Sequence, residues 1–355
     1  MNSWPTKKLG EVAQLRMGET LIRKDLTGDG VPVYSADSLE KPWGYTSKNK
    51  LKFRRGAIVI GARGTIGSLK LPEDNYFTST QTTIVVEPNI KEILPEFLFY
   101  FLNTLNFRKG GTGIPMITIG YLKTIKIPTF PLNIQQKIVE RLDAIKKVQE
   151  LNDKQIELAE ELFQSLLHRE LKSKIKNQKL KLQFKIKKLR EVITINYGKG
   201  LAKSERKENG RYFAYGSNGP VYKTNKILVN NPTIIIGRKG AVGALYLTKE
   251  PSWPIDTTFY VEIKDKDELD LDFLYFLLQT MNLQYLAIVT AVPGINRDNL
   301  YNLKIPLPPL ETQKKIVEKL SAVQEYKKKL LDQKQKLQEL FDSVLNKSFK
   351  GESLE

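Results

Sequence analysis

Apolar residues recur every seven positions in two long stretches of this chain, 131–172 and 309–350. In each stretch a second apolar position follows the first by four residues, which is the a/d pattern of a coiled coil. Each stretch is therefore predicted to form one long α-helix. The apolar seam positions of the two helices are Ile138, Leu142, Ile145, Ile156, Phe163, Leu166, Ile316, Leu320, Val323, Leu330, Leu337, Phe341 and Val344.

Polar residues interrupt both seams near the middle. Gln149 and Asn152 in one seam and Lys327 and Lys334 in the other fit a device that fixes the register of a helix pair. A helix of roughly 37 residues is about 55 Å long, too long for one small domain to cover. We therefore predict an antiparallel pair. Two unrelated helices, each packed on its own domain, are the alternative that the sequence leaves open.

The second stretch repeats the first, and the rest of the chain repeats with it. Gln135 and Phe163 fall on Gln313 and Phe341, a constant shift of 178 residues. Each copy is therefore a domain followed by a helix rather than one solenoid repeat. The predicted fold is two similar α+β domains separated by an antiparallel two-helix coiled coil, an internal pseudo-two-fold repeat. The predicted boundaries are 1–130, 131–172, 173–186 (a Lys-rich linker), 187–308 and 309–350.

The sharpest motif inside the domains is a β-branched run followed by glycines three residues apart, at 58–67 and again at 234–243. The run predicts a buried strand, and the glycines predict a tight turn into the next strand. A phosphate-binding loop is disfavoured because the residues that follow are strand-like rather than helical.

Other segments repeat in the same order. The sequences 97–102 and 273–278 predict a buried helix, and paired threonines before each of them lead into strands. Gly/Pro loops at 110–120 and 291–300 precede a last strand that ends at Pro128 or Pro306. Each domain opens with a short helix-like or strand-leading segment, 7–12 or 187–192.

Composition adds a partner class. The chain of 355 residues has 57 Lys and Arg against 39 Asp and Glu, a formal charge of +18. This balance favours a polyanion, most often nucleic acid, although biased base composition also produces Lys-rich chains. The chain has no cysteine and no apolar signal or membrane segment, so we expect a soluble cytoplasmic protein.

Candidate DNA contacts lie on the predicted loops and turns. Basic, amide, hydroxyl and aromatic side chains there suit phosphate contacts, base-edge hydrogen bonds or stacking. For the aromatic residues, packing beneath a hairpin stays open, and for the turn residues, a solvated β-turn. The candidates are Arg16, Arg23, Lys41, Trp43, Tyr45, Arg63, Thr65, Lys199, Lys203, Ser217, Asn218, Tyr222, Arg238, Lys239, Asn296 and Arg297.

No residues stand out with catalytic or metal-ligating spacing. The single histidine, His168, is predicted to act as a cation at the C-terminus of the first long helix. Glu160 and Glu161 are interpreted as a solvated flank of the coiled coil. We find no Walker A loop, no N-P-P-Y or D-P-P-Y methyltransferase motif and no D…E-x-K nuclease set. We predict no catalytic residue and no metal ligand.

The order of the motifs resembles a known family. Each copy carries the glycine turn, the threonine pair, an F-L-Y-F-L-type helix and an I-P-x-x-P-L-x-x-Q-x-x-I-V-x-x-L start to its long helix. This order resembles the specificity subunit of type I restriction-modification systems, over nearly the whole chain. A nuclease or methyltransferase fused to recognition domains is disfavoured, because its catalytic part needs more residues than remain.

The resemblance implies two target recognition domains, each reading one half of a split DNA site with a fixed gap. The chain is then a non-catalytic subunit of a type I restriction endonuclease and adenine methyltransferase complex. The implied partners are double-stranded DNA, two methyltransferase subunits that use S-adenosylmethionine, and restriction (motor) subunits that use ATP and Mg²⁺. The chain itself needs no cofactor. The alternative is a protein-binding scaffold without sequence-specific DNA recognition.

Further expectations concern the helices. The outer helix faces, with Phe163, Phe341 and their neighbours, are expected to stay partly exposed. Two methyltransferase copies are expected to dock on the helices and the adjacent domain faces, and the isolated chain is expected to self-associate there. Two rigid helices are expected to fix the centres of the half-sites about one DNA turn apart, ~10 bp.

Overall fold

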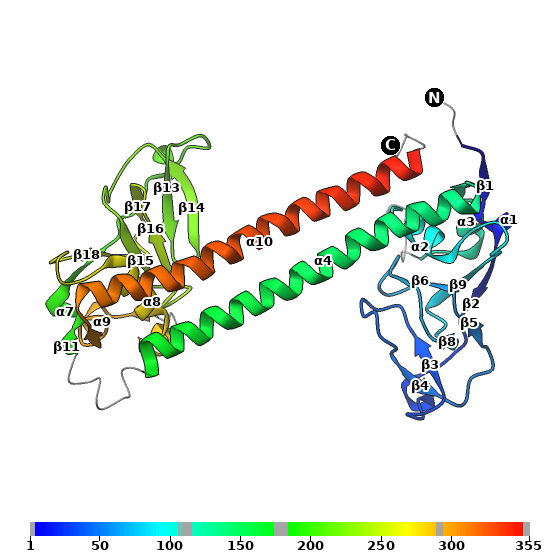
Figure 1. Cartoon of the computed structure of the whole chain (residues 1–355), viewed down its shortest axis with the longest axis horizontal. Helices are drawn as coiled ribbons and strands as arrows, with labels where there is room; N and C mark the ends of the chain where they lie inside the picture. Colours follow the sequence, from blue (N-terminus) through cyan, green and yellow to red (C-terminus); the bar gives the residue numbers. More distant parts are fainter. Residues whose placement is uncertain (1–3, 106, 108–115, 174–183, 289–293, 351–355) are drawn as a thin grey trace. The chain divides into compact units, whose positions relative to one another are not determined.

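The computed structural model describes residues 4–105, 107, 116–173, 184–288 and 294–350 (Figure 1). The chain divides into two compact units, a first unit of Met1–Asp153 with Asp332–Glu355 and a second unit of Lys154–Leu331. Each unit contains a part of both long helices. Residues 174–183 of the predicted linker, and parts of the predicted loops 110–120 and 291–300, lie outside the described residues, whereas Lys185 and Ile186 already belong to a strand.

The first unit is built on two sheets. The strands of the antiparallel sheet, in spatial order, are β2 (Ala13–Met17), β9 (Thr83–Pro88), β6 (Ile58–Gly61) and β7 (Leu69–Lys70). The strands of the mixed sheet, in spatial order, are β4 (Gly44–Thr46), β3 (Val31–Tyr34), β8 (Tyr76–Ser79) and β5 (Phe53–Arg54). In the mixed sheet β3 and β8 run parallel. A further pair joins the two ends of the domain, β1 (Thr6–Lys8) and β10 (Lys126–Pro128).

Strand β6 shows why the β-branched run folds as predicted. Ile58 and Ile60 pack into the larger core cluster, whereas Val59 faces a smaller cluster with Phe53 and Phe77. Successive side chains of a strand point to opposite faces, so a strand covered on both faces is apolar throughout. The helices of the first unit before the long one are α1 (Leu9–Val12), α2 (Pro95–Asn103) and α3 (Ile119–Thr124).

The second unit repeats this plan. The strands of its antiparallel sheet, in spatial order, are β12 (Ile193–Tyr197), β18 (Thr258–Ile263), β15 (Thr233–Gly237) and β16 (Leu245–Thr248). The second sheet consists of β14 (Gly219–Thr224), β13 (Tyr212–Gly216) and β17 (Ser252–Pro254). The strand pairs are β11 (Lys185–Lys188) with β21 (Lys304–Leu307), and β19 (Ala287–Ile288) with β20 (Gly294–Ile295). The short helices are α7 (Leu189–Val192), α8 (Leu271–Gln279) and α9 (Arg297–Tyr301).

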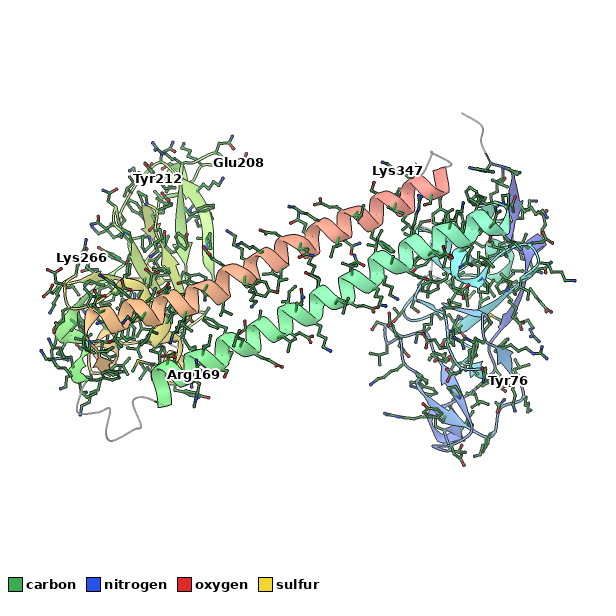
Figure 2. The ribbon with its side chains drawn as sticks, in the orientation of Figure 1. Tyr76, Arg169, Glu208, Tyr212, Lys266 and Lys347 are labelled. Atoms are coloured by element: carbon green, nitrogen blue, oxygen red, sulfur yellow. The ribbon has the colours of Figure 1, made fainter. Side chains whose placement is uncertain are left out.

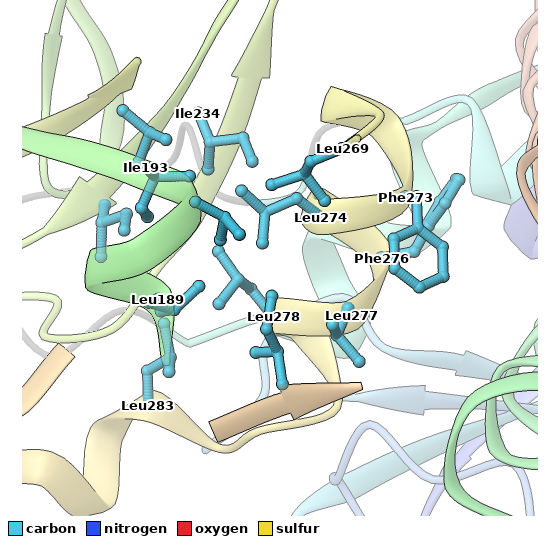
Figure 3. Packing of buried hydrophobic residues seen from close by; sticks show 14 of the residues in the cluster. Leu189, Ile193, Ile234, Leu269, Phe273, Leu274, Phe276, Leu277, Leu278 and Leu283 are labelled. Atoms are coloured by element: carbon cyan, nitrogen blue, oxygen red, sulfur yellow. The ribbon is translucent and has the colours of Figure 1, made fainter. Parts of the chain in front are cut away.

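The core of the second unit lies between its antiparallel sheet and α8. Figure 3 shows Leu274 of α8 pointing toward Ile193 and Ile234 of the sheet, while Phe273 and Phe276 lie on the other side of the helix. The buried helices α2 and α8 and the strands β7 and β16 after the glycine turns confirm the predicted elements. The short 3-10 helices among the described residues are η1 (Arg23–Asp25), η4 (Lys203–Glu205) and η5 (Leu283–Leu286).

The two long helices are α4 (Leu132–Leu167), which continues into a π-helical turn η3 (His168–Ser173), and α10 (Leu310–Lys350). In the first unit Lys334 Nζ lies 2.8 Å from Asp153 Oδ1, and Gln149 bonds to Gln338. In the second unit Lys327 Nζ lies 2.6 Å from Glu160 Oε2. In all three pairs the residue numbers add up to 487, so the helices run antiparallel in one register. The predicted antiparallel pair is confirmed.

Three of the predicted polar seam residues, Gln149, Lys327 and Lys334, make these cross-helix pairs, which fits their predicted role in fixing the register. The hydrogen bonds from Lys327 and Gln164 lower the pKa of Glu160, which stabilises its carboxylate form. Glu160 is thus a partner of the other helix and not only a solvated flank.

Two predictions about the helix ends, for Phe163 and for His168, are wrong. Phe163 is only 6% exposed and packs on Phe276, and Phe341 packs against Tyr100, because the end of each long helix covers the core of a unit. Phe163 is therefore not available for docking, whereas Phe341 stays partly exposed and the neighbours Leu162 and Leu340 are exposed, as predicted. His168 is not a helix C-cap, since the backbone continues into η3. Within the described residues, no helix is long and apolar enough to cross a membrane.

Candidate nucleic-acid interface

In each unit two loops meet at the end of the central buried strand. The backbone N–H of Ile117 donates to the carbonyl of Ala62 at 3.0 Å, and that of Ile295 donates to Arg238 at the same distance. Both isoleucines are buried. The glycine turn and the loop before the last short helix are therefore tied together by backbone in both units.

The glycines of the turn are required by its geometry. A Cβ on Gly61 would lie 2.3 Å from the carbonyl oxygen of Thr65, and one on Gly237 would lie 2.1 Å from that of Ala241. Gly64 and Gly240 both have φ of +79°, a left-handed conformation that favours glycine. The motif is thus a β-turn that presents the residues at its tip.

A third segment, the turn after β3 or β13, packs on the glycine turn. In the first unit the N–H of Thr65 donates to the carbonyl of Ala36 at 3.3 Å. Nearby, Lys70 is almost fully buried and pairs with Asp37 at 2.7 Å, which anchors this turn. Burial, followed by the hydrogen bond to Asp74, raises the pKa of Tyr34 well above its usual range, so Tyr34 stays a neutral donor.

In the second unit this cluster of turns presents basic and aromatic side chains. Tyr197, the last residue of β12, is 45% exposed, and the guanidinium groups of Arg238 and Arg297 both lie over its ring. Lys239, next to Arg238 in the glycine turn, and Asn218, in the turn after β13, are both exposed. Asn296 caps α9 by accepting from the N–H of Asp298, so its side chain has a local structural role.

In the first unit the same positions carry different residues. Met17 ends β2 where Tyr197 ends β12, and buried Ala62 takes the place of Arg238. Arg63 occupies the position of Lys239, and its Nε lies 3.0 Å from the sulfur of exposed Met116. The two units therefore present different surfaces on one frame.

The hairpins of the second sheets also expose predicted residues. Trp43 and Tyr45 flank Gly44 on β4, and both are exposed. Tyr222 on β14 is exposed, with the guanidinium of Arg206 over its ring at 4.0 Å. Figure 2 labels Tyr212 at the start of the neighbouring strand β13 and Glu208 in the loop before it. The remaining predicted residues with exposed positions are Arg23, Lys41, Thr65, Lys199 and Lys203.

Two predicted contact residues interact within their own unit. Arg16 is held by Glu87 of the neighbouring strand β9, with Nε 2.9 Å from Oε2, and lies over Phe53. Ser217 is buried against the glycine turn, because Gly237 and Gly240 approach it closely. Ser217 is therefore not presented to a ligand, whereas the Arg16 side chain is held by an ion pair and stays 41% exposed.

Sequence reasoning missed Tyr197, Arg206 and Met116. The repeat itself carries a signal for Tyr197, because aligning 193–197 with 13–17 places an aromatic residue against Met17 at a strand end. Arg206 and Met116 have no such local signal. Among the described residues, no cluster of three or more His, Cys, Asp or Glu side chains is placed to hold a metal ion.

The two units share the same antiparallel sheet and the same cluster of turns, so they are two copies of one class of domain. Comparison with known proteins identifies that class. A family model described as the type I restriction modification DNA specificity domain matches residues 1–161 and again residues 181–340. The chain therefore belongs to the family of type I restriction-modification DNA specificity domains, and it carries two copies.

Individual relatives agree with this assignment. A type I restriction enzyme specificity subunit of Methanocaldococcus jannaschii is 27% identical over 318 residues, covering 78% of this chain and 74% of that protein. A putative type I specificity subunit of Mycoplasma pneumoniae is 28% identical over 231 residues, covering 61% of this chain and 60% of that protein.

Solved structures share the fold. The crystal structure of a type I restriction-modification S subunit from M. genitalium superposes with a TM-score of 0.68 at 21% identity, covering 98% of this chain and 96% of that one. A chain from a structure on assembly and conformational transition of the type I R-M system superposes with a TM-score of 0.63 at 19% identity, covering 99% of each.

Proposed function

We propose that this chain is the DNA sequence-specificity subunit of a type I restriction-modification enzyme and binds a split DNA site, one half per domain. The proposal rests on one observation. Both units have the same cluster of backbone-tied turns, but the exposed side chains on these turns differ between the units. Backbone-tied turns supply rigid positions, and side chains that differ between the units supply different readout.

The partners and cofactors complete the proposal. Two methyltransferase subunits bind S-adenosylmethionine, the restriction subunits bind ATP and Mg²⁺, and this chain supplies no catalytic group. Exposed apolar residues along the outer faces of the long helices support docking of other subunits there. Two of these positions recur at the 178-residue shift, Val148 with Tyr326 and Leu162 with Leu340. The exposed apolar set on the long helices is Leu132, Val148, Leu151, Leu158, Leu162, Tyr326, Leu331 and Leu340.

This docking surface is the expected outer face of the helices, without the buried Phe163. The double change Leu158→Glu and Leu162→Glu is expected to abolish co-purification of the methyltransferase subunits, because it would bury charge in an apolar contact. The melting temperature of the isolated chain should hardly change, since both leucines are more than half exposed. The matched control is Glu157→Gln with Glu161→Gln, at exposed neighbours on the same helix. Unchanged co-purification of the leucine variant would refute this surface.

The helix register gives a second expectation, about spacing. In the register of the cross-helix pairs, whose residue numbers add up to 487, Asn152 of α4 lies opposite Gln335 of α10. Deleting seven residues around both positions preserves the a/d seam and is expected to change the gap between the half-sites. Deleting seven residues around Asn152 alone shifts one helix by two turns against the other and should abolish the complex. Methylation mapping reads the gap, and an unchanged gap in an active doubly shortened variant would show that something else sets it.

The proposed function is tested by co-expressing the chain with methyltransferase subunits and mapping methylated adenines in the host genome. A split motif with a constant gap is expected, together with two methyltransferases per chain. A protein-binding scaffold would give no new methylation motif. A complex built on such a scaffold would also show no log-linear fall of its DNA affinity with salt concentration, which phosphate contacts produce.

A further inference from the structure

The second unit holds two arginines on one tyrosine. Arg238 Cζ lies 5.0 Å from the centre of the Tyr197 ring, and Arg297 Cζ lies 5.1 Å from it. Each guanidinium also contacts a second ring, Phe259 for Arg238 and Tyr301 for Arg297, at 5.8 Å. Stacking on aromatic rings restricts the plane of a guanidinium group.

The backbone under this cluster is fixed. The N–H of Ile295 donates to the carbonyl of Arg238 at 3.0 Å, which ties together the loops that carry the two arginines. Arg238 Nη1 donates to the carbonyl of Asp256 at 3.1 Å. The hydroxyl of Tyr301 accepts from the N–H of Ile195 at 2.9 Å, beside the end of β12. The cluster is therefore held in place before any ligand arrives.

The two cations lack a counter-ion in the part of the chain that the structure describes, where no carboxylate lies within ion-pair distance of either guanidinium. By contrast, Arg16 in the first unit is paired with Glu87. Two like charges on one ring repel each other, so a ligand with acceptor atoms relieves an unfavourable interaction. Both arginines are part-buried and stacked on aromatic rings, and no carboxylate pairs with them among the described residues. Their N–H groups can therefore donate to acceptor atoms of a bound ligand.

The first unit has the same turns but lacks the cluster of two arginines on a tyrosine. The equivalent residues there are Met17, Ala62 and Ile119, which are apolar. Contacts to phosphates serve both halves of a DNA site alike, whereas base contacts must differ between halves. The stacked arginine pair is present in the second unit only. This difference favours readout of DNA bases over contacts to the DNA backbone.

We propose that Arg238 and Arg297 read guanine in the half-site bound by the second domain, and that Tyr197 is the positioning residue for both. This inference rests on the proposed function. Guanine presents two acceptors, O6 and N7, in the major groove, and the planar arginine fork binds them together. The half-site of the second domain therefore contains guanine on one of its strands.

The test uses the complex of the chain with its methyltransferase subunits. Methylation mapping first gives the split motif of the wild type, and Arg238→Ala and Arg297→Ala identify the half-site that changes. Each variant is expected to lose about 5- to 150-fold in affinity for cognate DNA and to relax that half only. Replacing the critical guanine with 7-deazaguanine, which lacks N7, should weaken wild-type binding at least several-fold. The same replacement should have little further effect in one of the arginine variants.

Two controls separate positioning from folding. Tyr197→Phe keeps the aromatic face and is expected to retain discrimination, whereas Tyr197→Leu should lose it at an unchanged melting temperature. Arg63→Ala, at the tip of the equivalent turn of the first unit, should leave this half-site unchanged.

Three results would overturn the inference while leaving a split motif, and so the proposed function, intact. One is a second half-site with no guanine on either strand. Another is wild-type binding that ignores 7-deazaguanine. The third is an arginine variant that weakens all sequences equally and lowers the salt slope by about one, which would indicate a phosphate contact.

Discussion

Replacing Gln135 with leucine is expected to lower the free energy of unfolding of the first unit by ~3–6 kcal/mol, because one buried and two part-buried backbone groups lose their partner. Gln135 is fully buried at the start of α4. Its Nε2 donates to the carbonyls of Glu92 at 2.9 Å and Phe130 at 2.8 Å, and its Oε1 accepts from the N–H of Leu94 at 2.8 Å. One side chain therefore joins the start of the long helix to the loop before α2.

The second unit has the same arrangement of hydrogen bonds around Gln313, so the prediction applies to both units. Gln313 donates to the carbonyls of Glu268 and Pro308 and accepts from the N–H of Asp270. Gln313→Leu is expected to destabilise the second unit by a similar amount. Hydrogen exchange measured by mass spectrometry assigns each loss to its own unit, which a global melting curve cannot do for two units.

The exposed neighbour Gln136 provides the matched control. Gln136→Leu should change exchange protection in neither unit, because its side chain bonds only within its own helix, to Glu140. If Gln135→Leu changed the free energy of unfolding by less than about 1 kcal/mol, the satisfied backbone groups would not be what secures the helix start.

The second large effect is expected at the far end of the chain. Phe349 of α10 packs on Phe97 and Phe101 of α2, with ring centres 5.2 Å and 5.3 Å apart, and Leu345 is buried in the same core. Phe349→Ala or Leu345→Ala is expected to destabilise the first unit by ~2–5 kcal/mol, since each leaves a cavity in a core. Residues almost 250 positions away in sequence thus complete the first domain.

Leu340→Ala is the control, because Leu340 lies on the same helix but is about half exposed. It should cost less than about 1 kcal/mol. Equal effects of all three substitutions on the exchange of α2 would mean that α10 stabilises the first unit only through its helix propensity and not through the buried contacts.

Much of the architecture could be predicted because it repeats or has a period. The a/d pattern predicted both long helices, and the cross-helix pairs of Lys327 and Lys334 confirm the antiparallel pairing. The glycine turn was predicted from residue types alone, since a Cβ at Gly61 or Gly237 would collide with backbone. These features have local causes that are visible in the sequence.

Other features depend on contacts between distant residues. Phe163 and Phe341 look like seam residues with an open side, and only the folded core shows that Phe276 and Tyr100 cover them. Arg16 looks free until β9 places Glu87 beside it. The Tyr197 cluster joins a strand end, a glycine turn and a helix start that are separated by about 40 to 100 residues, so no local pattern encodes it.

The central claim is that each domain reads its own half of one DNA site. Its most direct test replaces Ile186–Pro306 of the second domain with Thr6–Pro128 of the first, between the equivalent strand pairs at the two domain bases. Two identical domains in a pseudo-two-fold repeat read the same sequence on opposite strands. Methylation mapping of a host carrying this chimaera and its methyltransferase is predicted to show the first half-site followed by its inverted repeat, with the original gap. A motif that keeps the second half-site, or that changes in both halves, would contradict the claim.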